Sequence, residues 1–89
     1  MVEEKIGIVT HFFNHINVAA IKITHNELNI GETIHINGAH TDFTQSVESM
    51  QIDKESVETA KRGDEIGIKV RKRVREHDDV YKKLDEKVG

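Results

Sequence analysis

The sequence predicts an all-β domain, and two patterns support this prediction. Isoleucine and valine dominate the apolar residues, and both are common in strands. Short segments of alternating apolar and polar residues are separated by turn residues about every 8–12 positions. This arrangement is typical of a small antiparallel barrel or sandwich, because the segments are too short for parallel βαβ units.

Alternating apolar positions define the expected strands. These span residues 5–13, 18–24, 33–37 and 43–52, a fifth strand from 64 onward, and a short final strand that begins at Val80-Tyr81. Ala19, Ile21 and Ile23 recur at every second position and therefore share one face. Ile34 and Ile36 follow the same rule, and we expect both to point inward.

Turn residues separate these strands. Asn37-Gly38 is a strong hairpin signal, and Gly63-Asp64 predicts a chain reversal because glycine adopts positive φ freely. Within residues 43–52 the apolar spacing changes from three to two, which a β-bulge would explain. Met50, in the same segment, is expected in the core rather than on a docking surface. Residues 53–62 form the helix-like piece, for which we expect one or two turns.

The composition limits the class of protein. The chain has 89 residues, so we expect a single domain over 1–89, with a core at 5–83 and a frayed tail at 84–89. The absence of cysteine excludes disulfides, thiolate metal sites and a cysteine nucleophile. No apolar run predicts a signal peptide or a membrane span, and we expect a cytoplasmic protein. A net charge of −3 provides no global basic field.

The segment 69–75 is the most functional-looking feature, because positive charge is concentrated there. If the strand alternation of Ile66 continues, the basic side chains at alternate positions share the solvent face and could follow a phosphate backbone. The predicted nucleic-acid-binding residues are Lys61, Arg62, Lys69, Arg71, Lys72, Arg73 and Arg75. The alternative is an edge strand protected by charge, or neutralisation by the acidic residues of segment 76–79.

Other chemically capable residues form no recognisable pattern. The six histidines are scattered, and the spacing of His11 and His15 does not converge on a strand and turn. The serines lack a G-x-S-x-G elbow, and no pair of carboxylates is marked for acid–base chemistry. The sequence therefore predicts no catalytic residue, no metal site and no cofactor.

Motifs in the middle and at the end of the chain resemble known β-barrels. Residues 28–36, 47–50 and 60–68 resemble the second domain of translation GTPases such as elongation factor Tu, whereas residues 41–45, 49–52 and 79–82 are similar to the barrel that closes collagenase-like peptidases. Together these motifs cover roughly residues 5–83. The resemblance implies a small closed antiparallel six-stranded Greek-key barrel with one short helical turn. No G-x-x-x-x-G-K-[ST] loop is present, so we infer no nucleotide hydrolysis.

The resemblance and the basic segment together predict a non-catalytic binding module related to translation factors. Its partner would be RNA (tRNA or rRNA) or a translation protein, contacted through the basic edge, with no membrane and no small-molecule substrate. The alternative is an accessory barrel that docks on a separate GTPase-like or peptidase-like partner. A small hydrolase is a third possibility and would need a concave pocket with a perturbed titrating group.

Overall fold

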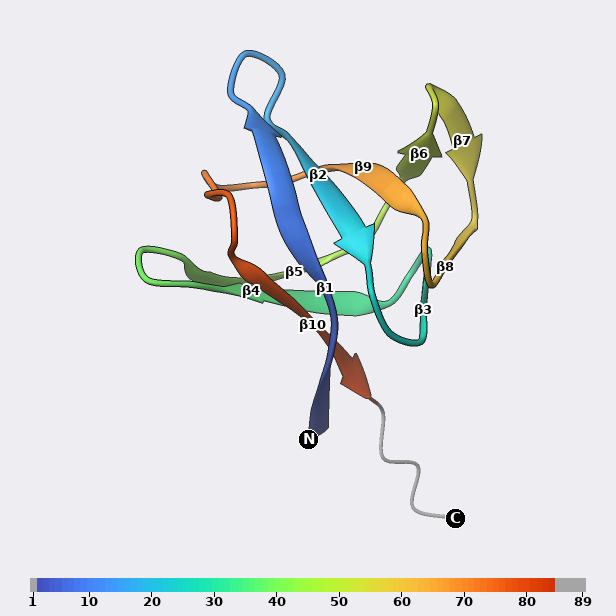
Figure 1. The fold of residues 1–89 in the computed structure, drawn as a ribbon, viewed down its shortest axis with the longest axis horizontal. Helices are drawn as coiled ribbons and strands as arrows, with labels where there is room; N and C mark the ends of the chain where they lie inside the picture. Colours follow the sequence, from blue (N-terminus) through green and yellow to red (C-terminus); the bar gives the residue numbers. More distant parts are fainter. Residues whose placement is uncertain (1, 85–89) are drawn as a thin grey trace.

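The computed structural model describes residues 2–84, which form strands and turns but no helix (Figure 1). The strands are β1 (Val2–Phe13), β2 (Val18–Ile23), β3 (Glu27–Asn29), β4 (Thr33–Asn37), β5 (Asp42–Ser46), β6 (Met50–Ile52), β7 (Glu55–Val57), β8 (Thr59–Lys61), β9 (Glu65–Lys69) and β10 (Asp79–Leu84). The all-β prediction is confirmed. Within the described residues, no helix is long and apolar enough to cross a membrane.

Eight of the strands form one curled antiparallel sheet, in the order β5-β4-β10-β1-β2-β9-β6-β7, and β3 pairs separately with β8. The sheet ends at β5 on one side and at β7 on the other, and no ladder joins these ends in the described part of the chain. The predicted closed six-stranded Greek-key barrel is therefore wrong in strand number and in closure.

The segment expected to form a single fourth strand explains part of this difference. Val47 extends the pairing of β5 by donating its N–H to the carbonyl of Glu32, at 2.9 Å. The chain then leaves β4, and in β6 Gln51 pairs with Gly67 of β9. The changed apolar spacing therefore marks a strand that moves from one neighbour to another, and not the predicted β-bulge.

The short helical turn predicted at residues 53–62 is also wrong. Asp53 and Lys54 have φ angles of 51° and 69°, and they form a tight turn between β6 and β7. Positive φ at both central residues is the backbone geometry of a hairpin turn. Ladder pairing of β7 with β6, and of β8 with β3, then replaces the local helical preference.

The reversal predicted after β8 is confirmed. Gly63 has a φ angle of 97°, which only glycine adopts without strain. The Asp64 side chain accepts a hydrogen bond from the backbone N–H of Lys61 at 2.8 Å. This turn delivers the chain into β9, where Ile66 and Ile68 point into the core.

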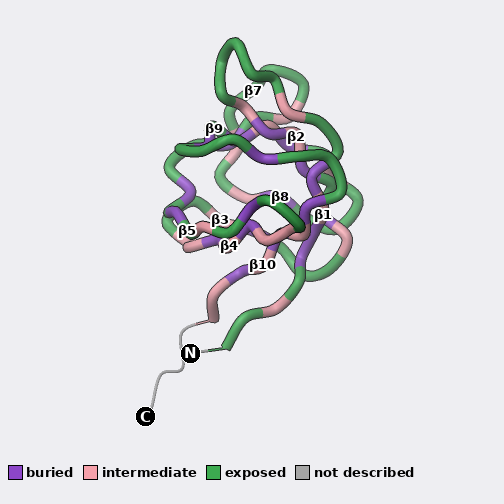
Figure 2. Tube along the Cα trace, turned by 90° about the vertical axis from the view of Figure 1, so that its left-hand side faces the viewer, coloured by how far each residue is buried: buried purple, intermediate pink, exposed green. Residues whose placement is uncertain are grey.

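The core lies inside the curled sheet and is built mainly from aliphatic side chains. Figure 2 marks the buried residues along the chain. The residues predicted to point inward, Ala19, Ile21, Ile23, Ile34 and Ile36, all have 0% of their surface exposed. Met50 is also fully buried, so its predicted place in the core is confirmed.

The last strand runs further than expected. Leu84 pairs with Val2 at the end of β10, although the predicted frayed tail begins at residue 84. Lys82 is buried, and its ammonium group donates to the carbonyl of Glu27 at 2.8 Å and lies 3.4 Å from a carboxylate oxygen of Glu32. This contact ties β10 to the β2–β4 connection. The rest of the predicted tail, 85–89, lies outside the described residues.

Candidate functional site

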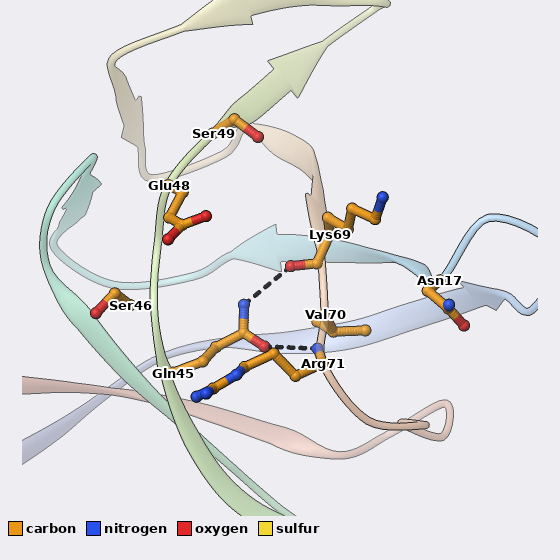
Figure 3. A pocket seen from close by; sticks show the side chains of 8 residues that line it. All are labelled: Asn17, Gln45, Ser46, Glu48, Ser49, Lys69, Val70 and Arg71. Atoms are coloured by element: carbon orange, nitrogen blue, oxygen red, sulfur yellow. Dashed lines mark hydrogen bonds between the residues drawn. The ribbon is translucent and has the colours of Figure 1, made fainter.

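Gln45 bridges a seam between β5 and segment 69–71, which begins at the end of β9. Its Nε2 donates to the carbonyl of Lys69 at 2.9 Å, and its Oε1 accepts the backbone N–H of Arg71 at 2.9 Å (Figure 3). Gln45 itself is 7% exposed. A side-chain amide carries the same donor and acceptor as a peptide group. Gln45 therefore takes the place of a backbone ladder between β5 and the end of β9.

A groove of about 630 Å³ lies along this seam. Its lining residues are Asn17, Gln45, Ser46, Glu48, Ser49, Lys69, Val70 and Arg71 (Figure 3). The volume is within the range of ligand-binding pockets, about 300–1,000 Å³, but the lining is mostly polar. Among the residues that the structure describes, no ion pair involves Lys69, Arg71 or Glu48.

A second feature is the tip of the β1–β2 hairpin, which projects at the end of the molecule opposite the N-terminus (Figure 1). Phe13 is 47% exposed and Ile16 is 59% exposed. The N–H of Ile16 donates to the carbonyl of Phe13 at 3.2 Å, so one turn holds both side chains. The ring of His11 packs edge-on against Phe13, with ring centroids 4.5 Å apart.

The predicted basic ladder does not form, because β9 ends at Lys69 and the segment that follows is irregular. Val70 and Val74 are buried and hold this segment against the core. The N–H of Val70 donates to the carbonyl of Asn17 at 2.8 Å, which ties the segment to the hairpin. Alternate positions after β9 therefore do not share one strand face.

All seven predicted binding residues are exposed, but the fold distributes them over three places. Lys69 and Arg71 line the groove. Arg73 and Arg75 line a smaller hollow beside the hairpin, and Lys72 lies between these two pairs in the chain. The remaining two, Lys61 and Arg62, lie in β8 and in the turn before β9.

In the part of the chain that the structure describes, the acidic residues of segment 76–79 do not neutralise these basic side chains, so the structure does not support this alternative. Glu76 bonds His11 at 3.1 Å, and Asp79 bonds Lys5 at 2.9 Å. Asp78 accepts the backbone N–H of Arg75 at 2.8 Å instead of pairing with a guanidinium group. Each of these three acids therefore binds another group in the fold and, within the described chain, forms no ion pair with the predicted binding residues.

Sequence reasoning missed the role of Gln45. The sequence offers one signal for this role, which is that Gln45 is a polar residue at an inward strand position, in alternation with Phe43 and Val47. The partners of Gln45 lie 24 and 26 residues further along the chain, beyond the reach of local patterns.

His35 lies at the centre of a separate charged cluster that spans four strands. Its Nδ1 is 2.9 Å from Glu3, and its Nε2 is 2.5 Å from Asp42. The hydrogen bond to Glu3, followed by that to Asp42, raises the pKa of His35 above 6.5. The hydrogen bond from His35 lowers the pKa of Asp42 below 3.8. Lys83 lies 3.9 Å from Glu3, and the Tyr81 ring centroid is 6.0 Å from that of His35.

This cluster predicts a pH-dependent contribution to stability. The raised pKa of His35 gives stability that is present below about pH 6.5 and is lost as the pH rises through the folded-state value. We expect His35→Gln to lower the melting temperature more at about pH 5.5 than at about pH 9. Thermal melts at both pH values test this, with the exposed His40→Gln as the control. An equal loss at both pH values would contradict it.

The cluster is an ion-pair network and not a metal site. Over residues 2–84, no group of three or more histidine, aspartate or glutamate side chains is arranged to hold a metal ion. Glu3 and Asp42 bind opposite nitrogens of the His35 ring, so the three groups do not converge on one point.

Comparison with known proteins gives relatives by sequence. No family model matches the chain. The chain is 44% identical over 78 residues to an uncharacterized protease of Methanocaldococcus jannaschii, a match that covers 86% of this chain and 19% of the relative. It is 36% identical over 72 residues to a collagenase of Porphyromonas gingivalis, covering 80% of this chain and 20% of the relative. The chain thus spans about a fifth of the length of these relatives.

Solved structures give relatives by fold. Two crystal structures of the C-terminal domain of a Geobacillus thermoleovorans protein, named as a U32 peptidase, superpose with TM-scores of 0.82 and 0.84. The first match covers 86% of this chain and 96% of that domain, and the second covers 91% and 93%. Both are 18% identical in sequence to this chain, so the similarity establishes the fold alone.

These comparisons support the resemblance to collagenase-like peptidases and not that to translation factors. The predicted translation-related RNA-binding role is wrong, because the relatives are named as a protease and a collagenase and the matching fold is a peptidase C-terminal domain. The chain therefore has the fold of a U32 peptidase C-terminal domain and is similar in sequence to a part of proteins named as peptidases.

Proposed function

We propose that this chain is a non-catalytic accessory module that docks on a peptidase-like catalytic unit through the tip of the β1–β2 hairpin. The observation that carries the proposal is the sequence match to about a fifth of the length of proteins named as peptidases. The larger part of each relative lies outside the match, and we place catalysis there.

The groove supports a non-catalytic role. Among its described lining residues, Glu48 is the carboxylate, and neither a second carboxylate nor a histidine accompanies it. General acid–base catalysis needs groups that are positioned to exchange protons with the substrate.

The hairpin tip has the chemistry of a contact surface. Phe13 and Ile16 are apolar and exposed, and burying one such side chain fully contributes about 1.5–3 kcal/mol. Arg73 and Arg75 line a hollow beside the same hairpin, together with Phe12, Asn14 and Glu76. Aromatic and arginine side chains are enriched at protein interfaces. The expected partner surface is therefore apolar at its centre and acidic at its rim.

The proposal predicts the effect of polar substitutions at the tip. The partner for the measurement is the Methanocaldococcus jannaschii protease from which the matching 78 residues have been removed. We expect the intact chain to bind it, and the double variant Phe13→Ser/Ile16→Ser to bind about 10- to 100-fold more weakly, because a buried apolar anchor contributes about 2 kcal/mol or more. Isothermal titration calorimetry measures both affinities.

The matched control is Ile30→Ser, which removes another apolar side chain, 41% exposed, from the turn that follows β3. This variant is expected to bind like the wild type. Absence of binding by the intact chain, or equal weakening by the control, would overturn the proposal.

A further inference from the structure

We propose that the groove between β5 and segment 69–71 binds an extended peptide that carries an acidic side chain, and that this peptide adds to the outer edge of β5. The inference goes beyond docking at the hairpin, since it concerns a different surface and a different ligand. It rests on the backbone, the shape and the charge of the groove.

The backbone of β5 has an unused edge. Val47 donates its N–H to the carbonyl of Glu32, and Gln45 stands opposite Ile34 in the ladder with β4. In an antiparallel pair, alternate residues bond the partner strand and the residues between them face away. Thr44 and Ser46 therefore direct their N–H and carbonyl groups away from β4. Because β5 is the terminal strand of the sheet, no described strand meets them.

The groove has room beside this edge. Ser46 belongs to its lining, and segment 69–71 forms the facing wall (Figure 3). The Gln45 side chain spans the space between the two walls. An extended peptide that pairs with Thr44 and Ser46 would displace this side chain and take over its bonds to the backbone of Lys69 and Arg71. Strand addition to an exposed sheet edge is a common mode of peptide recognition.

The charge of the groove favours an acidic side chain on the peptide. Lys69 and Arg71 project from one wall, and neither has an ion-pair partner among the residues described. Glu48 on the other wall is a single opposing charge. An arginine with no competing partner can bind a carboxylate through two parallel hydrogen bonds. The peptide backbone would therefore pair with β5 while its carboxylate lies toward Lys69 and Arg71.

Titration of the ¹⁵N-labelled whole chain with defined peptides tests the proposal. The probe is the acetylated and amidated peptide Thr-Val-Glu-Val-Thr-Val. We expect the amide signals of Thr44, Ser46 and Arg71 to shift. A peptide with lysine in place of glutamate is expected to bind about 10-fold or more weakly. A peptide with proline at alternate positions lacks the pairing N–H groups and is expected not to bind.

A variant in the edge itself sharpens the test. Ser46→Pro removes an N–H group that faces away from β4, so it leaves the ladder with β4 intact, and proline is tolerated on edge strands in this orientation. We expect this variant to lose peptide binding while the signals of β1 and β2 stay in place. Ser46→Ala, which keeps the N–H, is expected to bind like the wild type. Arg71→Glu is expected to weaken binding without removing the edge.

Several results would overturn the inference. One is binding that Ser46→Pro leaves unchanged, and another is equal binding of the proline peptide. Peptide-induced shifts confined to the hairpin would mean that the peptide binds the hairpin and not β5. Shifts of Thr44 that depend on protein concentration without peptide would mean that a second copy of this chain occupies the edge. The variant Phe13→Ser/Ile16→Ser is expected to bind the peptide like the wild type. A failure of docking at the hairpin can therefore be distinguished from a failure of peptide binding at β5.

Discussion

Replacing Gln45 by leucine is expected to lower the free energy of unfolding by about 1–3 kcal/mol. Leucine has a similar size but can neither donate to the carbonyl of Lys69 nor accept the N–H of Arg71. A typical intramolecular hydrogen bond contributes about 0.5–1.5 kcal/mol, and here two partly buried bonds are lost at once. Urea unfolding followed by circular dichroism measures the change.

The control for this substitution is Thr44→Leu, on the same strand but at an exposed position. Surface substitutions usually change stability by less than about 0.5 kcal/mol. Hydrogen exchange gives a second measurement, because the Arg71 amide is expected to exchange faster in Gln45→Leu. If Gln45→Leu is as stable as Thr44→Leu, the two hydrogen bonds do not hold the seam.

Replacing Met50 by alanine is expected to lower the free energy of unfolding by about 2–5 kcal/mol. Met50 is fully buried at the start of β6, opposite Val57 in the ladder with β7. Truncation removes apolar contacts and leaves a cavity that the surrounding sheet can fill only in part. The midpoint of urea unfolding reports the loss.

Met50→Leu is the matched control, since it nearly conserves the volume and is expected to cost less than about 1.5 kcal/mol. Gln51→Ala, at the exposed neighbouring position, is expected to leave stability almost unchanged. A small loss in Met50→Ala would mean that the surrounding sheet relaxes to fill the space that the side chain leaves.

The strands that the sequence predicts well are those with one buried face. β2 and β4 lie where alternation places them, and Ile21, Ile34 and Ile36 point inward. A strand with one face in the core has its register specified by a period of two, so a local pattern is enough to find it.

The misassigned segments are those whose structure depends on distant partners. Segment 43–52 divides because Val47 bonds Glu32 whereas Gln51 pairs with Gly67. Residues 53–62 have a helical composition, but their backbone pairs with β3 and β6. A short segment has too little local preference to oppose such pairing. Lys54, with positive φ, is also an unusual residue for a hairpin turn.

The functional prediction failed for a related reason. The motif residues that resemble translation factors, such as Gly63, Ile66 and Ile68, form a turn and part of the core. Such residues report the fold and carry no information about the ligand, because one fold serves many functions. The groove depends instead on Gln45 and on the end of β9, which the chain brings together only after folding.

The Gln45 bridge has a mechanical consequence for the molecule. Across residues 2–84, the hydrogen bonds that span this line both belong to one amide, whereas neighbouring strands are joined by whole ladders. If these two bonds break, every strand keeps its ladder neighbours, and Val47 and Val70 still pack in the same core. We therefore expect the line between β5 and segment 69–71 to open at a lower free energy than global unfolding. A peptide strand bound there would stabilise the domain against this opening.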